Sequence, residues 1–86
     1  MAWYPLKGDG SALRGSGFFG DARLDAQLAA LSGVRWRAEG GVRELAIPWE
    51  PGEPFPLTEL FCFARPESVE GRSCVVYRID AQGMPL

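Results

Sequence analysis

The sequence predicts an α+β domain, with a four- to five-stranded, mainly antiparallel sheet and one helix packed on one face of it. Three observations support this fold class: one segment has leucines at helical spacing, two alternating runs flank a Gly-Gly pair, and two more apolar runs follow a proline-rich stretch. The optional fifth strand is a short one around Trp3 to Leu6. A chain of 86 residues buries too little surface for two independent units, so we expect one domain over 1–86.

The helix is expected over 21–32. Leu24, Leu28 and Leu31 fall four and three residues apart, so they share one helical face, and alanines fill many of the other positions. Gly33 follows where a glycine in the left-handed conformation commonly ends a helix.

The segment 34–47 is expected to form a β-hairpin. Gly40-Gly41 separates its two alternating runs, and glycine readily adopts the positive φ angles that a two-residue primed turn requires. Folding about this turn pairs Val34 with Ile47, Trp36 with Leu45, and Arg37 with Glu44. Apolar pairs on one face and an ion pair on the other are typical of a half-buried antiparallel hairpin.

A second strand pair is expected over 60–79, formed by the apolar runs Leu60–Ala64 and Cys74–Ile79. The polar stretch between the runs is expected to be their connection, centred near Ser68, which would bring Cys62 nearly opposite Cys74. Because both runs are almost continuously apolar, they are predicted to be central strands covered on both faces.

The core is expected to come from the apolar side chains of these elements. They are Leu24, Leu28, Leu31, Val34, Trp36, Leu45, Ile47, Phe61, Phe63, Val75, Tyr77 and Ile79. Together they would cover the face of the sheet that the helix packs against.

The composition argues against several classes of function. Nine basic and eleven acidic side chains give a net charge of -2, so we expect no nucleic-acid partner. The chain has no histidine, which excludes Ser-His-Asp and Cys-His catalysis and zinc sites with imidazole ligands. Two cysteines are too few for a closed structural metal site. We therefore expect no catalytic residue, no metal and no cofactor, which favours a non-catalytic role over an enzyme.

A cytoplasmic location is expected. The first residues lack the basic and apolar regions of a secretory signal, and no apolar run approaches the roughly 18–20 residues that cross a bilayer. We therefore expect no membrane partner, and reduced cysteines.

The proline-rich loop 48–57 is the leading candidate for a partner-binding site. It combines two large aromatic side chains, Trp49 and Phe55, with two carboxylates, Glu50 and Glu53. A proline-stiffened loop loses little conformational entropy on docking, and aromatic residues are enriched in interfaces. In the alternative interpretation Trp49 and Phe55 fold inward and close one end of the sheet, because a small domain needs its aromatic residues in the core.

The glycine-rich segment 1–20 is expected to be mainly a surface loop. Residues 15–20 match the pattern G-x-G-x-x-G before the helix, but the residues ahead of them are a poor strand for a dinucleotide-binding unit. We therefore expect Phe18 and Phe19 either to dock on the core or to present a second aromatic contact to a partner.

The leading functional hypothesis is a non-catalytic protein-binding module, such as a small cytoplasmic inhibitor, an immunity-type protein, an adaptor or an assembly subunit. Its expected contact residues are Trp49, Glu50, Glu53, Phe55, Phe18 and Phe19. One alternative is a small-ligand, nucleotide-binding or enzymatic domain that uses the 8–20 loop, with polar groups from Arg14, Ser16 or Cys74. Another is a homo-oligomer formed through an exposed sheet edge.

Overall fold

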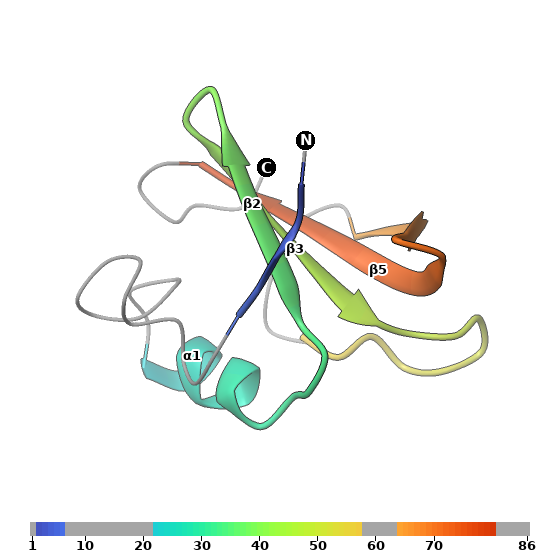
Figure 1. The fold of residues 1–86 in the computed structure, drawn as a ribbon. Coiled ribbons are helices and arrows are strands. Elements are labelled where there is room, and N and C mark those ends of the chain that lie inside the picture. The colour runs from blue at the N-terminus through green and yellow to red at the C-terminus, as the bar shows by residue number, and fades with distance from the viewer. Residues whose placement is uncertain (1, 7–21, 58–63, 81–86) are drawn as a thin grey trace.

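The computed structural model describes residues 2–6, 22–57 and 64–80, and the structural statements below refer to these residues. They form one five-stranded sheet and one short helix (Figure 1). The strand order is β1-β2-β3-β5-β4, and every neighbouring pair is antiparallel. The elements are β1 Tyr4–Pro5, α1 Ala22–Ala29, β2 Arg35–Glu39, β3 Val42–Pro48, β4 Arg65–Val69 and β5 Arg72–Ile79. An antiparallel sheet with few helical residues confirms the fold class in its coarse form.

The helix α1 is shorter than the expected 21–32. Beyond its last residue, the amides of Ala30 and Leu31 donate to carbonyl oxygens only three residues back, at 3.2 and 3.1 Å, so the chain tightens before it leaves the helix. Gly33 then adopts a φ of 73°, the left-handed conformation expected of it. A Cβ on Gly33 would lie 3.1 Å from Cγ of Pro48, so the chain after α1 passes close to the end of β3.

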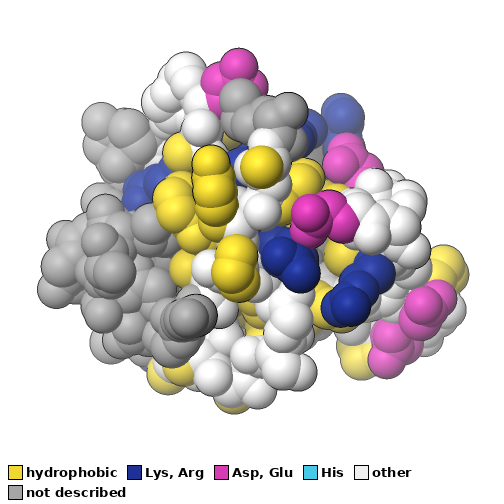
Figure 2. All heavy atoms as spheres, in the orientation of Figure 1, with side chains coloured by type: hydrophobic (Ala, Val, Ile, Leu, Met, Phe, Trp, Pro, Cys, Tyr) yellow, Lys and Arg dark blue, Asp and Glu magenta, His cyan; other side chains and the backbone are white. Residues whose placement is uncertain are grey.

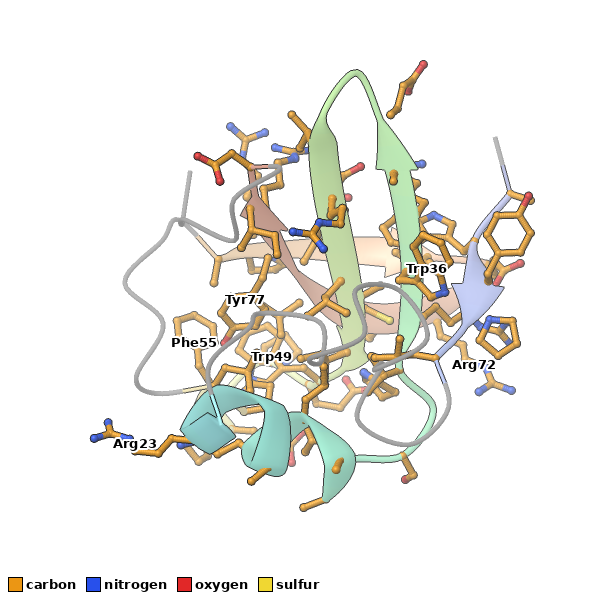
Figure 3. All side chains as sticks on the ribbon, turned by 90° about the vertical axis from the view of Figure 1, so that its left-hand side faces the viewer. Arg23, Trp36, Trp49, Phe55, Arg72 and Tyr77 are labelled. Carbon is orange, nitrogen blue, oxygen red and sulfur yellow. The ribbon has the colours of Figure 1, made fainter. Side chains whose placement is uncertain are left out.

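The helix lies below the strands in both Figure 1 and Figure 3, at one end of the sheet. The expected packing of the helix on one face of the sheet is therefore not confirmed. Its contribution to the core comes through Leu28, which is buried with side chains of β3 and β5, while Leu31, just after the helix, packs on the same cluster at its margin.

The β2–β3 hairpin confirms the register expected around Gly40-Gly41. Trp36 lies opposite Leu45, and Arg37 lies opposite Glu44. The two glycines have φ angles of 60° and 80°, as a type I′ turn requires. Val34, which was expected opposite Ile47, precedes β2; it is buried in the same cluster as Ile47, and its carbonyl oxygen accepts a hydrogen bond of 2.9 Å from the amide of Leu6.

The second strand pair corrects the sequence-based prediction. Its turn is at Glu70 and Gly71, with φ angles of 52° and 78°, and not near Ser68. Ser68 lies within β4, and Cys74 of β5 lies opposite Glu67, not opposite Cys62. The polar stretch expected to be a connection forms an edge strand, and an edge strand with exposed side chains does not need an apolar sequence. Residues 58–63, which hold most of the strand expected over Leu60–Ala64, lie outside the described residues.

The main core lies on one face of the sheet. Seven of the expected core residues are buried in it: Leu28, Val34, Leu45, Ile47, Val75, Tyr77 and Ile79. Trp36 is only partly buried at its margin, and Leu57, which the sequence analysis assigned to a loop, is buried within it. The side chains of Leu24, Phe61 and Phe63 lie outside the described part of the chain.

A smaller cluster, which was not predicted from the sequence, occupies the opposite face. It contains Ala46, Val69, Cys74 and Val76, with Trp3 packed against it. Four consecutive residues of β5, Cys74 to Tyr77, are buried as a result. This burial confirms that the continuous apolar run in β5 belongs to a strand covered on both faces.

Each edge of the described sheet has a proline whose backbone points outward. The amide of Trp49 donates to the carbonyl oxygen of Ser73, so the backbone of Ser73 faces β3. In an antiparallel strand the backbone groups of successive residues face opposite sides, so Val75 also bonds toward β3, whereas Cys74 and Val76 bond toward β4. By this alternation Pro66 of β4 faces away from β5. The bond from Leu6 to Val34 likewise turns Pro5 of β1 outward. Proline has no N–H, so neither edge presents a complete row of donors to another strand.

Candidate functional site

The proline-rich segment 48–57 is attached to β5 at both of its ends. At its start, the amide of Trp49 donates to the carbonyl oxygen of Ser73 at 3.1 Å, and the Ser73 hydroxyl donates back to the carbonyl oxygen of Trp49 at 2.7 Å. At its end, the amide of Leu57 donates to the Tyr77 hydroxyl at 3.3 Å, and that hydroxyl lies 3.4 Å from the carbonyl oxygen of Leu57. Ser73 and Tyr77 were not among the predicted site residues, although a buried tyrosine hydroxyl generally needs a polar partner.

Hydrogen bonds within the segment close a turn between Glu50 and Glu53. The Glu53 amide donates to the Glu50 carbonyl oxygen at 3.1 Å, and the Glu50 amide donates to Oε1 of Glu53 at 2.8 Å. Pro51 and Gly52 occupy the central positions, and the φ of 99° at Gly52 suits a type II turn. The indole Nε1 of Trp49 donates to the Glu53 carbonyl oxygen at 3.0 Å, so the ring is bonded to the turn.

The two aromatic side chains of the segment have different surroundings. Trp49 packs against the main core, whereas Phe55 is 44% exposed. Their ring centroids are 5.3 Å apart, and Figure 3 shows them on the same side of the molecule as Tyr77. Among the described residues, the other exposed large hydrophobic side chain is Tyr4. Trp49 therefore packs inward, as in the alternative interpretation of this loop, whereas Phe55 remains exposed and available for a partner. We call residues 49–55 the aromatic turn.

The aromatic turn is acidic. Glu50 and Glu53 are exposed, and segment 48–57 contains no lysine or arginine. Figure 2 shows acidic and hydrophobic side chains next to each other at the lower right, where Figure 1 places the chain after β3. Neither carboxylate forms an ion pair with another described residue.

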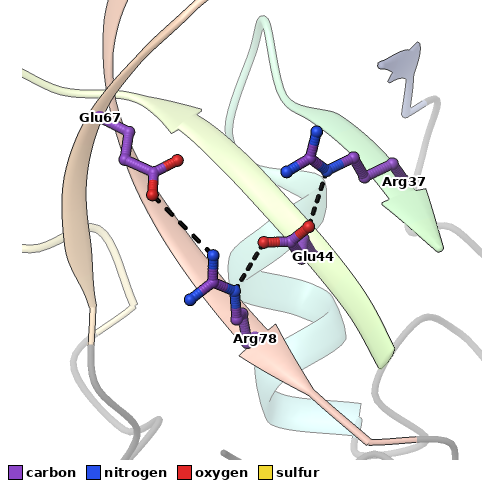
Figure 4. A network of polar contacts seen from close by, with 4 residues as sticks. All are labelled: Arg37, Glu44, Glu67 and Arg78. Atoms are coloured by element: carbon purple, nitrogen blue, oxygen red, sulfur yellow. Dashed lines mark hydrogen bonds and ion pairs between the residues drawn. The ribbon is translucent and has the colours of Figure 1, made fainter. Parts of the chain in front are cut away.

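Arg37 of the hairpin and Arg78 of β5 are paired with acidic side chains on the face opposite the main core. Glu44 accepts hydrogen bonds from Nε of Arg37 and from Nε of Arg78, each at 2.7 Å, and Arg78 also lies 3.9 Å from Glu67 (Figure 4). Burial alone would raise the pKa of Glu44, but both arginines act against it, and the pKa lies below its ordinary value. The Arg37 guanidinium also lies 4.2 Å from the ring centroid of Trp3.

An ion pair of 2.9 Å joins Arg35 of β2 to Glu70 in the β4–β5 turn, although β3 lies between β2 and β5 in the sheet. The sheet therefore curls toward this face. Since Arg35, Arg37 and Arg78 all have acidic partners, these side chains do not form a basic stripe of the kind that binds nucleic acid.

The Cys74 thiol is not placed for nucleophilic chemistry. It is buried, and burial raises the pKa of the thiol. A backbone hydrogen bond from Val69 and the charges of Arg72 and Arg35 act in the opposite direction, but their effect is smaller, so the pKa lies above its ordinary value. Within the described residues, no group of three or more histidine, cysteine, aspartate or glutamate side chains could hold a metal ion. The other candidate residues, Phe18, Phe19, Arg14, Ser16 and Cys62, lie outside the described part of the chain, and so does the 8–20 loop.

Comparison with protein-family models, curated proteins and solved structures gave no match to this chain. Within its described residues, no helix has the length and apolar character needed to span a bilayer. Function is therefore inferred from the geometry of the aromatic turn and its surroundings.

Proposed function

We propose that this chain is a non-catalytic protein-binding module that docks through its aromatic turn, with Trp49, Glu50, Glu53 and Phe55 as the contact residues. The observation that carries the proposal is the exposure of Phe55 on a turn that is hydrogen-bonded internally, within a segment, 48–57, that is attached to β5 at both ends. A contact surface that is already rigid loses little conformational entropy when it binds.

The exposed part of Phe55 can supply useful binding energy. A phenylalanine side chain has roughly 200 Å² of surface, and with 44% of the residue exposed, about 90 Å² can still be removed from water. At about 25 cal/mol per Å², burial of that area contributes about 2 kcal/mol, which is about 30-fold in Kd. Trp49, packed behind Phe55, supports the ring from the core side.

The edges of the sheet favour docking through side chains over strand addition. Pro5 and Pro66 each remove a donor at an outward-facing edge position, so a partner strand would meet a broken ladder at either edge. The aromatic turn offers its contact through side chains and does not depend on a free edge. A cytoplasmic inhibitor, an immunity-type protein, an adaptor or an assembly subunit would each use such a surface.

The proposal is tested by affinity capture with the purified protein as bait, followed by calorimetry with the purified partner. Phe55→Ala should weaken Kd by about 30-fold, for the reason given above. Tyr4→Ala is the matched control, since Tyr4 is also an exposed aromatic residue but lies on β1. Equal affinities of the wild-type protein and folded Phe55→Ala would refute docking through this turn, and so would capture of no partner.

A further inference from the structure

The carboxylates of the aromatic turn differ from those of Glu44 and Glu70 in how they are neutralised. Glu44 of β3 and Glu70 of the β4–β5 turn each lie within 3 Å of an arginine nitrogen. In the turn, Glu50 and Glu53 lie beside exposed aromatic surface, and no basic residue occurs anywhere in 48–57. The turn therefore has a local charge that a partner can neutralise.

Hydrogen bonds hold the two glutamates of the turn together. Oε1 of Glu53 accepts the amide of Glu50 at 2.8 Å, which places this carboxylate over the start of the turn. The Glu53 carbonyl oxygen accepts the indole N–H of Trp49 at 3.0 Å, and Trp49 in turn contacts Phe55. A ligand that reaches Phe55 therefore also comes close to negative charge that is fixed in position.

We infer that the partner surface docking on the aromatic turn is basic, with an arginine or lysine next to an apolar side chain. This inference rests on the proposed docking function and specifies its partner. The apolar side chain would cover Phe55, and the cation would lie between the aromatic rings and the Glu50 and Glu53 carboxylates. Arginine fits better than lysine, because its planar guanidinium can stack on a ring and bond a carboxylate through two N–H groups. A phosphorylated or acidic segment would be repelled.

Two model peptides test the inference with the full chain. The first is acetylated and amidated Leu-Arg-Leu-Arg-Leu, and the second is its neutral counterpart Leu-Gln-Leu-Gln-Leu. The readout is the indole N–H signal of Trp49 in ¹⁵N NMR spectra, because this group is bonded within the turn, and the indoles of Trp3 and Trp36 serve as internal references. The arginine peptide should bind with a Kd about fivefold lower than the glutamine peptide, and raising the salt concentration should remove the difference.

The double variant Glu50→Gln/Glu53→Gln separates charge from shape. Glutamine keeps an oxygen that can accept the Glu50-position amide, so the turn is retained while both charges are lost. The variant should lose the fivefold preference for the arginine peptide. Glu39→Gln is the control, because Glu39 is an exposed carboxylate at the tip of the β2–β3 hairpin.

The outcomes distinguish this inference from the proposed function. Equal binding of both peptides, each weakened by Phe55→Ala, would overturn the basic partner and leave docking through the turn supported. Binding that Phe55→Ala does not weaken would overturn both. If neither peptide shifts the Trp49 signal, or if Glu39→Gln removes the preference as fully as the double variant, the inference is also overturned.

Discussion

Glu44→Gln should destabilise the protein by about 2 kcal/mol. The Glu44 side chain is 13% exposed and accepts two hydrogen bonds of 2.7 Å from arginines that are 28% and 35% exposed. Exposed ion pairs contribute about 0–1 kcal/mol, and breaking a fully buried pair costs about 3–5 kcal/mol. This partly buried site falls between those limits. For a domain of this size, about 2 kcal/mol corresponds to a fall in Tm of roughly 8–16 °C.

The effect should depend on pH in a defined direction. The pKa of Glu44 in the folded protein is lowered, so the folded state binds this proton less readily than the unfolded chain does. Its contribution is therefore complete above the unfolded-state pKa of about 4.3 and is lost as the pH falls through the lower folded-state pKa. The difference in stability between wild-type protein and Glu44→Gln should be constant from about pH 7 to 5 and shrink below about pH 4.

Urea denaturation of both proteins across this pH range measures the difference directly. Glu67→Gln is the matched control, because Glu67 lies 3.9 Å from Arg78 and is 34% exposed. It should cost less than about 0.5 kcal/mol. The explanation would be refuted if both variants lost the same stability, or if the Glu44→Gln difference stayed unchanged at low pH.

The remaining predictions concern the anchor of the aromatic turn and the sheet edge. Tyr77→Phe should lower the free energy of unfolding by about 1–2 kcal/mol, because it leaves the buried backbone groups of Leu57 without the hydroxyl. Hydrogen exchange at the Leu57 amide should become faster, and unchanged exchange would contradict the anchoring role of Tyr77. Pro66→Thr should promote self-association, because threonine restores an outward N–H on the edge strand β4. Sedimentation measures this association, and a variant that associates no more than the wild type would contradict the role assigned to Pro66.

The elements with a strong local signal could be predicted from the sequence. Gly40-Gly41 fixed the hairpin register, because only one alignment brings Trp36 opposite Leu45 while pairing Arg37 with Glu44. The β4–β5 turn gave a weaker signal, since one of its two positive φ angles belongs to Glu70, and a non-glycine residue is uncommon there. The error in this turn misplaced the strand before it.

The residues of the candidate site could be predicted from the sequence, but the direction in which each aromatic ring faces could not. The residues of 48–57 drew attention because they combine aromatic and acidic side chains with prolines. Whether each ring faces inward depends on contacts that are distant in sequence: Trp49 is anchored by Ser73, and Leu57 by Tyr77. Sequence spacing alone does not contain these contacts. The second apolar cluster was missed for the same reason, because it brings Trp3 to residues of β3, β4 and β5.

The close approach of Gly33 to Pro48 links the exit from the helix to the base of the aromatic turn. At 3.1 Å from Cγ of Pro48, there is too little room for a methyl group at position 33 unless the proline shifts, and the φ of 73° there already disfavours any side chain. Pro48 immediately precedes Trp49, so such a shift would be passed directly to the ring that supports Phe55. Gly33, which is distant in sequence from the aromatic turn, thus helps to determine the shape that a binding partner would meet.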